Sequence, residues 1–176
     1  MFFKKIRSRR KRNLAYIITT LIIILAVTAI SSFYIVYTQS QLQKMLLSTE
    51  GFIEMEVEKL IPVGSNTLIQ LKNDCSELAF YISPWQASSI QEGIENTTPF
   101  RPSTHDILID ILEGYGIEPM LVKITKLSDR TYFAELTLKR GSHFLTLDTR
   151  PSDAIALAVR TDAPVYVNES LVMKVC

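Results

Sequence analysis

The longest apolar run of the chain lies near its N-terminus. Leu14–Tyr37 contains 24 positions without a single charged side chain. About 20 predominantly apolar residues are enough for an α-helix to cross the hydrocarbon core of a bilayer. Tyr16 lies close to one end of the run and Tyr37 closes the other, and tyrosine favours the membrane–water interface. The pattern predicts a single transmembrane helix over residues 14–37, with the lipid bilayer as its partner.

The charges around this run predict its orientation. Lys4–Arg12 contains all seven basic residues of the first 37 positions, and no acidic residue precedes Thr38. Because positively charged flanks stay on the cytoplasmic side, residues 1–13 are expected to be a cytoplasmic tail and the C-terminal domain is expected outside the cytoplasm. A cleaved signal peptide is the alternative, since Val27-Thr28-Ala29 has the small residues of a cleavage site. The apolar run continues past that site, which favours a retained anchor.

Alternating polar and apolar positions mark the start of the domain. Residues 38–51 are polar with leucines at helical spacing, which predicts a stalk. Phe52–Ile61 alternates between apolar and acidic positions, which predicts one half-buried strand. Thr67–Leu71 and Leu78–Ile82 predict two more strands around a polar turn.

A helix and a second run of strands follow. Ser83-Pro84 suits the cap and first position of a helix, in which Trp85, Ala87 and Ile90 are expected as a buried stripe. The later strands are expected at Ile117–Leu127, Thr131–Lys139, Ser142–Leu147, Pro164–Val167 and, at an edge, Leu171–Val175. Together with the two helices described below, the pattern predicts an α+β domain over residues 52–176, with mainly antiparallel sheets and three helices packed on them.

The charge is divided unevenly along the chain. The whole sequence carries 19 basic and 18 acidic residues, a formal net charge of +1. Residues 38–176 hold 12 of the basic and all 18 of the acidic residues, which leaves this part at −6. Broad binding to a phosphate backbone needs clustered basic side chains, so any nucleic-acid partner has to meet a local basic site.

The two cysteines give little direction. Cys75 and Cys176 are too few and too scattered, even with the two histidines, to indicate a zinc site. They can pair if the domain faces an oxidising compartment, and the sequence leaves that pairing open. It also leaves the oligomeric state open, a homo-oligomer included.

The first of two polar junctions, Arg101–Asp106, opens a helix expected over Ile107–Gly114. Ser103 and Asp106 have the spacing of a capping box, which gives Asp106 a structural explanation. His105 is the stronger candidate for acid–base chemistry, because imidazole titrates near neutral pH.

The second junction, Asp148–Arg160, repeats Arg-Pro-Ser and a following aspartate after a strand. Thr149 is expected as the N-cap and Pro151 fits the first helical turn. Asp153 lies where exposed N–H groups favour a carboxylate. Capping alone explains these residues, although such junctions also hold functional side chains on a rigid scaffold.

Both junctions and one segment beyond them carry a family resemblance. They read RPSTHD at Arg101–Asp106, DTRPSDAIAL at Asp148–Leu157 and APVYV at Ala163–Val167. These blocks resemble the bifunctional nuclease (BFN) domain family, over roughly Phe52–Val172. The resemblance implies a nuclease that hydrolyses phosphodiester bonds of RNA, DNA or both, with nucleic acid as its partner.

A phosphodiesterase site built from both junctions is expected on this basis. The expected catalytic residues are His105, Asp106, Asp148 and Asp153, and the expected substrate-binding residues are Arg101, Arg150 and Ser152. Carboxylate oxygens suit Mg²⁺ or Mn²⁺, so Asp148 and Asp153 are the expected ligands of such an ion, which would activate water. The arginines would clamp the phosphate.

A non-catalytic interpretation competes with this one. Arg101, Asp106, Arg150 and Asp153 can instead form a structural ion-pair network that pins two helix ends in a membrane-tethered binding or scaffold module. The acidic charge favours this alternative. Gln86 favours it too, because relatives usually carry glutamate there and an amide is neither an acid nor a strong cation ligand. The intact motifs favour the nuclease, provided that the two junctions meet in space.

Overall fold

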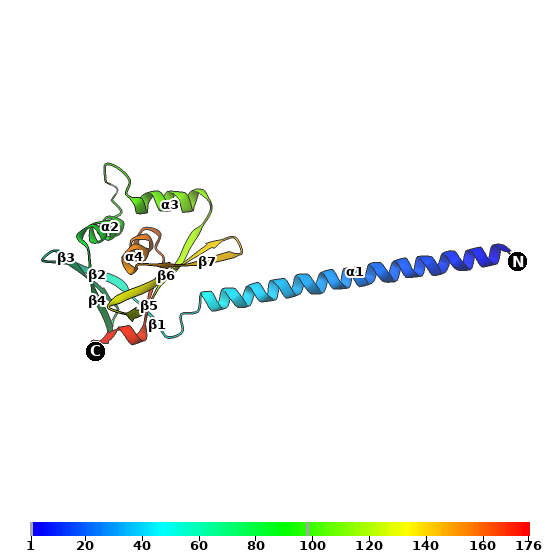
Figure 1. Cartoon of the computed structure of the whole chain (residues 1–176), viewed down its shortest axis with the longest axis horizontal. Helices are drawn as coiled ribbons and strands as arrows, with labels where there is room; N and C mark the ends of the chain where they lie inside the picture. The colour runs from blue at the N-terminus through cyan, green and yellow to red at the C-terminus, as the bar shows by residue number, and fades with distance from the viewer. Residues whose placement is uncertain (1, 98) are drawn as a thin grey trace. The chain divides into compact units, whose positions relative to one another are not determined.

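The computed structural model describes residues 2–97 and 99–176, with side chains described from Tyr16 onward (Figure 1). The chain divides into two compact units between Met45 and Leu46. Helix α1 (Phe2–Leu46) runs without a break from the predicted tail through the predicted span and ends within the predicted stalk of residues 38–51. Within the described residues, its segment Tyr16–Leu46 is the one helix long and apolar enough to cross a bilayer. The apolar N-terminal helix expected from the sequence is therefore present.

The second unit contains two sheets and three α-helices, which confirms the predicted α+β class. The elements are β1 (Phe52–Glu54), β2 (Glu56–Val63), β3 (Asn66–Lys72), β4 (Ser76–Ile82), α2 (Pro84–Ile94), α3 (Thr104–Gly114), β5 (Glu118–Ser128), β6 (Thr131–Arg140), β7 (His143–Thr149), α4 (Pro151–Thr161), β8 (Val165–Asn168), the 3₁₀-helix η1 (Glu169–Leu171) and β9 (Met173–Lys174). The strand orders are β1-β8-β5-β6-β7 and β2-β3-β4-β9. Every pairing is antiparallel except that of β5 with β8.

The first predicted strand is divided between the two sheets. β1 pairs with β8, whereas β2 pairs with β3. Between them Met55 is buried, and its N–H donates to the carbonyl of Val165 at 2.9 Å. The prediction of one strand over Phe52–Ile61 is wrong because the side-chain alternation continues through Met55 while the backbone changes partner there.

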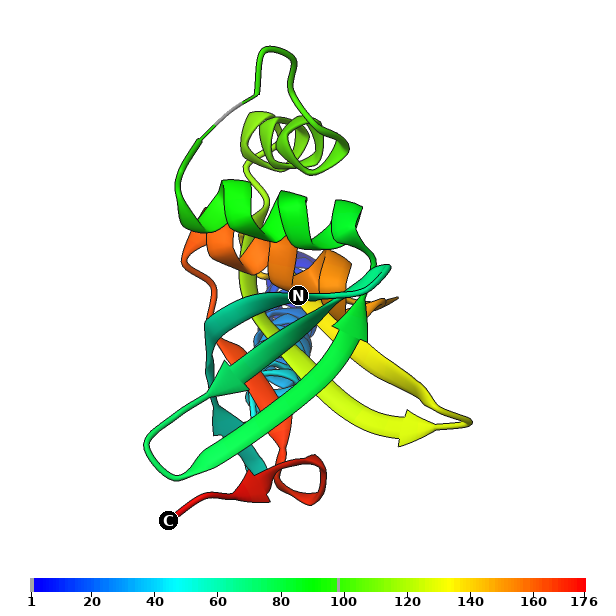
Figure 2. The ribbon, with the colours of Figure 1, turned by 90° about the vertical axis from the view of Figure 1, so that its left-hand side faces the viewer.

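Helices α2 and α4 lie side by side over the strands (Figure 2). α4 packs on β5 and β6, and α2 contacts β2 and β3. Small and aliphatic residues bury most of α4. The fully buried aliphatic side chains come from both sheets and both helices: Ile69, Leu71, Ile90, Val122, Ile124, Leu136, Ile155 and Val167. One core therefore joins the elements that carry the candidate site.

Trp85 does not belong to this core. Its side chain is 86% exposed. The buried face of α2 carries Ala87, Ile90 and Gly93, so the predicted stripe is confirmed at Ala87 and Ile90 and wrong at Trp85. Successive residues of an α-helix are rotated by about 100° around its axis. Trp85 is two positions before Ala87, so it lies on nearly the opposite side of α2 from the buried face.

Two helix starts differ from the predictions. α3 begins at Thr104, three residues before Ile107, directly after the cap Ser103. The N-cap of α4 is Arg150, which makes no side-chain capping bond, and not Thr149, which ends β7. The predicted positions of Pro151 in the first turn and of the Ser103 capping box are confirmed.

A disulfide joins Cys75 to Cys176, a pairing that the sequence left open. The two residues are 101 positions apart, and the bond links the β3–β4 turn to the C-terminal residue. The Val175 N–H also donates to the Cys75 carbonyl at 3.0 Å. The last strand is therefore tied to its sheet by both covalent and hydrogen bonds.

We expect Gly93→Ala to destabilise the domain by about 1–3 kcal/mol, because overpacking a close helix–helix contact forces the neighbours to move. A Cβ at Gly93 would lie 2.5 Å from Val159 Cγ2 and 2.8 Å from Arg160 Nη1. Urea unfolding of the full-length protein in detergent micelles measures the loss. Gly114→Ala is the control, because a Cβ at Gly114 meets nothing within 4 Å. Equal stability of the two variants would contradict the close approach of α2 and α4.

Candidate functional site

The two polar junctions meet through His105 and Asp153. His105 Nε2 lies 3.9 Å from Asp153 Oδ1, so the first turn of α3 faces the first turn of α4. Ser89 of α2 approaches from the other side, with its Oγ 2.9 Å from His105 Nδ1. We call Ser89, His105, Asp106, Asp153 and Arg160 the three-helix junction, because each of the three helices contributes to it.

A capping box holds the α3 side of the junction. The Ser103 N–H donates to Asp106 Oδ2 at 2.8 Å, and the Asp106 N–H donates to Ser103 Oγ at 3.3 Å. The reciprocal bonds satisfy two N–H groups that a helix start otherwise leaves without partners. His105, the residue before Asp106, is thereby fixed in the first turn of α3.

Arg160 connects all three helices from within. Its side chain is only 9% exposed, and its Nε donates to Asp106 Oδ1 at 2.8 Å. Nη1 donates at 2.8 Å to the carbonyls of Ser89 and Ala156, and Nη2 lies 3.8 Å from Glu92 Oε2. Sequence reasoning missed this residue. The sequence does contain a signal for it, because Arg160 is a single charged residue that directly follows the apolar run Ala154–Val159.

Asp153 has a more open environment than Asp106. Its Oδ2 accepts a 2.7 Å hydrogen bond from Arg150 Nε, while its Oδ1 faces His105. The Arg150 side chain is 75% exposed. One face of the junction therefore reaches solvent with an arginine, a carboxylate and an imidazole side by side.

The junction shifts the pKa values of two groups. Burial lowers the pKa of His105 most strongly, and Arg160 and Arg150 add to this, while Asp153 and Asp106 act in the opposite direction. The lowered pKa of His105 favours the neutral form of the imidazole. Burial opposes the charged form of Asp106, but hydrogen bonds from Arg160 and Ser103 outweigh it, so the pKa of Asp106 is lowered.

The remaining predicted site residues, Arg101, Asp148 and Ser152, make no hydrogen bond or ion pair with His105 or Asp153 in the described part of the chain. Arg101 and Asp148 are exposed, and neither has a hydrogen bond or ion pair with the junction among the described residues. Asp148 lies on β7 opposite Glu135 of β6. Ser152 is buried, and its Oγ accepts a 2.8 Å hydrogen bond from Gln86 Nε2. Gln86 also completes the Ser83 capping box.

The carboxylates do not form a ready cation site. Both oxygens of Asp106 accept hydrogen bonds, and one oxygen of Asp153 is held by Arg150. In the described part of the chain, no three His, Cys, Asp or Glu side chains gather as metal ligands. The donor set thus does not fit Mg²⁺ or Mn²⁺ held by protein ligands alone, and the expected ion at Asp148 and Asp153 stays a prediction.

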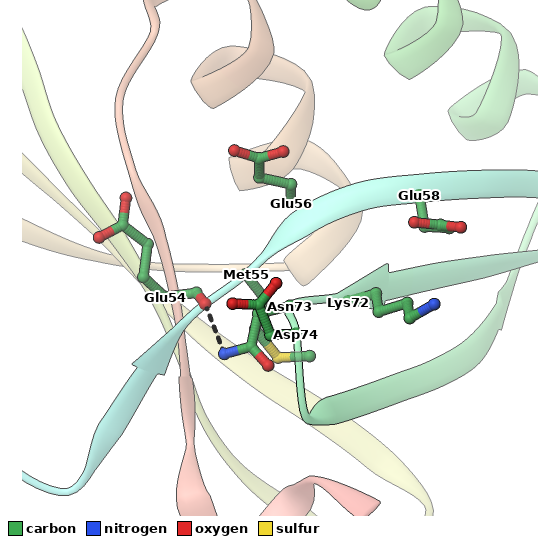
Figure 3. Close-up of a pocket in the computed structure, with 7 residues that line it drawn as sticks. All are labelled: Glu54, Met55, Glu56, Glu58, Lys72, Asn73 and Asp74. Carbon is green, nitrogen blue, oxygen red and sulfur yellow. Dashed lines mark hydrogen bonds between the residues drawn. The ribbon is translucent and has the colours of Figure 1, made fainter. Parts of the chain in front are cut away.

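A surface pocket of about 590 Å³ lies elsewhere, where the chain crosses from β1 to β2 (Figure 3). No predicted site residue lines it. Its lining residues are Glu54, Met55, Glu56, Glu58, Lys72, Asn73 and Asp74. Four of these seven are acidic and would repel a phosphodiester, so this pocket does not suit a nucleic-acid substrate.

We expect Arg160→Leu to destabilise the domain by about 3–5 kcal/mol, because it leaves Asp106 largely buried without its partner. The same change at Arg150, whose ion pair is exposed, should cost less than about 1 kcal/mol. Urea unfolding of the full-length protein in micelles compares the two. Adding Asp106→Asn to Arg160→Leu should recover part of the loss. Equal losses for both arginines would contradict the bridging role of Arg160.

The lowered pKa of Asp106 predicts an acid-dependent loss of stability. The folded-state pKa lies below the ordinary value of 3.8, so the contribution is present above that pH and is lost as the pH falls through the folded-state pKa. Urea unfolding midpoints between about pH 5 and pH 2 should fall less steeply in Asp106→Asn than in wild type. Parallel curves would show that Asp106 is not held in its charged form by folding.

Comparison with known proteins places these motifs in a family. A model of the bifunctional nuclease domain matches residues 68–176, more than half of the chain. A Mycobacterium tuberculosis protein named only as uncharacterized is 33% identical over 107 residues, which cover 59% of this chain and 62% of that protein. Bifunctional nuclease 2 of Oryza sativa subsp. japonica is 39% identical over 85 residues, 47% of this chain and 26% of that protein.

A third relative agrees with these. Bifunctional nuclease 1 of Arabidopsis thaliana is 34% identical over 85 residues, again 47% of this chain and 26% of the relative. The chain thus spans less than two thirds of the curated relatives described here. The region matched by the family model contains all three segments that resemble the family and the whole three-helix junction, and on this match the chain belongs to the bifunctional nuclease domain family.

Proposed function

We propose that this protein is a membrane-anchored nuclease that hydrolyses phosphodiester bonds of RNA, DNA or both. Family membership supports the reaction class, and the plant relatives described above bear the name bifunctional nuclease. The observation that carries the proposal is the position of His105. Its imidazole, with a side chain 20% exposed, lies between Ser89 and Asp153, where the two family motifs meet.

His105 is the proposed general base and acid. A neutral imidazole accepts a proton from the attacking group and returns it to the leaving oxygen. Asp153 stabilises the imidazolium that forms in between, since its Oδ1 faces the ring at 3.9 Å. Asp106 supports the site from behind through Arg160. Asp148, on the neighbouring strand β7, is proposed to act only once substrate or a cation is bound.

The exposed arginines are proposed to bind the phosphate. Arg150 lies beside Asp153 with its guanidinium largely in solvent, and Arg101 precedes the cap of α3. Residues 38–176 carry a net negative charge, which opposes binding of a phosphate backbone. A local arginine site can still bind phosphate, because a planar guanidinium group donates to two phosphate oxygens at once. Ser152, being buried against Gln86, is proposed to hold the loop and not to contact substrate through its hydroxyl.

An extracytoplasmic site is proposed for the domain. The basic N-terminal flank supports a cytoplasmic N-terminus by the positive-inside rule. The Cys75–Cys176 disulfide supports the same orientation, because such bonds persist in oxidising compartments. The anchor is proposed to be retained, with α1 crossing the bilayer once.

We expect His105→Ala to lower cleavage of single- and double-stranded DNA and of RNA by about 10²–10⁴-fold, because the acid–base group is lost. Full-length protein in detergent micelles is assayed with each substrate. His143→Ala is the matched control, since the chain has two histidines and His143 is exposed on β7. Cleavage that survives His105→Ala unchanged would sink the proposed site.

Adding a chelator to the same cleavage assay tests the proposed cation. Loss of cleavage on adding EDTA, restored by Mg²⁺ or Mn²⁺, supports an ion that completes its ligands with substrate and water. Cleavage unaffected by EDTA would remove the cation from the proposal while leaving His105 in place.

The non-catalytic scaffold remains a second candidate because of one observation. The Arg160–Asp106 pair is mostly buried and pins three helices, as a structural ion-pair network should. The network differs from the expected one, because Asp106 pairs with Arg160 and not with Arg101. Absence of cleavage by wild type on every substrate, together with a large stability loss in Arg160→Leu, is the result that favours the scaffold.

A further inference from the structure

Ser89 makes an unusual contact for a serine inside a helix. Serine hydroxyls in helices commonly bond back to a carbonyl of the preceding turn. Thr161 of α4 does so, with its Oγ1 3.0 Å from the carbonyl of Leu157. Among the described residues, the only hydrogen-bond partner of the Ser89 side chain is His105 Nδ1, at 2.9 Å. The hydroxyl is thus directed out of its own helix and towards the imidazole.

The surroundings decide which partner donates. A neutral imidazole has one N–H and one lone pair. Asp153 faces Nε2 and, as a carboxylate, can only accept, so the proton is favoured on Nε2. In that tautomer Nδ1 carries the lone pair, and the Ser89 hydroxyl is the donor of the 2.9 Å hydrogen bond. The serine hydroxyl is thus hydrogen-bonded to its base, and a carboxylate lies behind the base at 3.9 Å, an ionic contact longer than a hydrogen bond.

Other features of the site suit a reaction at this hydroxyl. The side chains of His105 and Asp153 are 20% and 30% exposed, and Ser89 is half-buried, so the group reaches solvent. Arg160 holds the Ser89 carbonyl at 2.8 Å, which fixes this turn of α2. α4 begins without a side-chain cap beside Asp153, and the positive end of a helix favours an approaching anion.

We propose that Ser89, His105 and Asp153 form a serine nucleophile site, with Ser89 Oγ as the attacking atom, His105 as its base and Asp153 as the group that orients the base. The proposal rests on the proposed function for its natural substrate, a nucleic-acid phosphodiester. It assigns the chemical step to a residue outside both family motifs.

The reaction balances in two steps. Ser89 Oγ attacks phosphorus while its proton passes to His105 Nδ1, the Oγ–P bond forms, and the bond from phosphorus to the leaving nucleoside oxygen breaks. The protonated imidazole gives its proton to that oxygen. Water then attacks the phosphoserine diester, His105 accepts a proton from the water and returns it to Ser89 Oγ, and the net change is hydrolysis of one phosphodiester bond.

The test is labelling of the full-length protein in detergent micelles with a fluorophosphonate. Ser89 Oγ displaces fluoride, forming an Oγ–P bond as the P–F bond breaks, and mass spectrometry locates the adduct. We expect an adduct on Ser89 in wild type and at least about 10²-fold slower labelling in His105→Ala and His105→Gln, because the base is lost. Ser88→Ala is the matched control, since Ser88 is the neighbouring serine and its hydroxyl bonds to Glu92 instead.

The outcomes separate this site from the proposed function. No adduct on Ser89, or equal labelling with and without His105, overturns the serine site whatever the nuclease assay shows. Cleavage of nucleic acid that is unchanged in Ser89→Ala also overturns it while leaving the nuclease intact. Base-dependent labelling of Ser89 in a wild-type protein that cleaves no nucleic acid supports the serine site and rejects the nuclease.

Discussion

One buried guanidinium holds the site together. Arg160 comes from the last turn of α4, yet its nitrogens reach the carboxylate of Asp106 on α3 and the carbonyl of Ser89 on α2. A charge this deeply buried persists only when it is paired and hydrogen-bonded. The pairing requires α2 and α4 to approach closely, which is why Gly93 lies against Arg160 where any side chain would collide.

The chemical residues take their positions from this structural pair. Ser89 is fixed through its carbonyl, and His105 is the residue next to Asp106, so both ends of the Ser89–His105 hydrogen bond are attached to groups that Arg160 holds. Asp153 lies in the first turn of α4, at the opposite end of that helix from Arg160. The scaffold and nuclease interpretations therefore concern different residues. The buried Arg160–Asp106 pair is structural, and the more exposed His105 and Asp153 are where chemistry can occur.

Local patterns predicted much of this arrangement from the sequence. The alternating runs gave the strands, and Ser83 and Ser103 marked helix starts that form as capping boxes. The failures have a common cause. Arg160 was missed because its partner is 54 positions away and no local pattern specifies it. The single strand predicted over Phe52–Ile61 was wrong because one alternating run serves two sheets, and pairing partners are a long-range property.

The two Arg-Pro-Ser motifs look alike in sequence but enter their helices differently, and this difference separates the two aspartates. In the first motif Ser103 is the cap, so its hydroxyl and the Asp106 carboxylate close a capping box, and Arg160 takes the remaining oxygen. In the second motif the register moves by two residues and Arg150 becomes the cap. A guanidinium has no acceptor and cannot close such a box, so Arg150 donates to Asp153 instead. One oxygen of Asp153 is thereby left facing His105. A shift in helix start, with the same three residue types, makes one carboxylate structural and places the other at the imidazole.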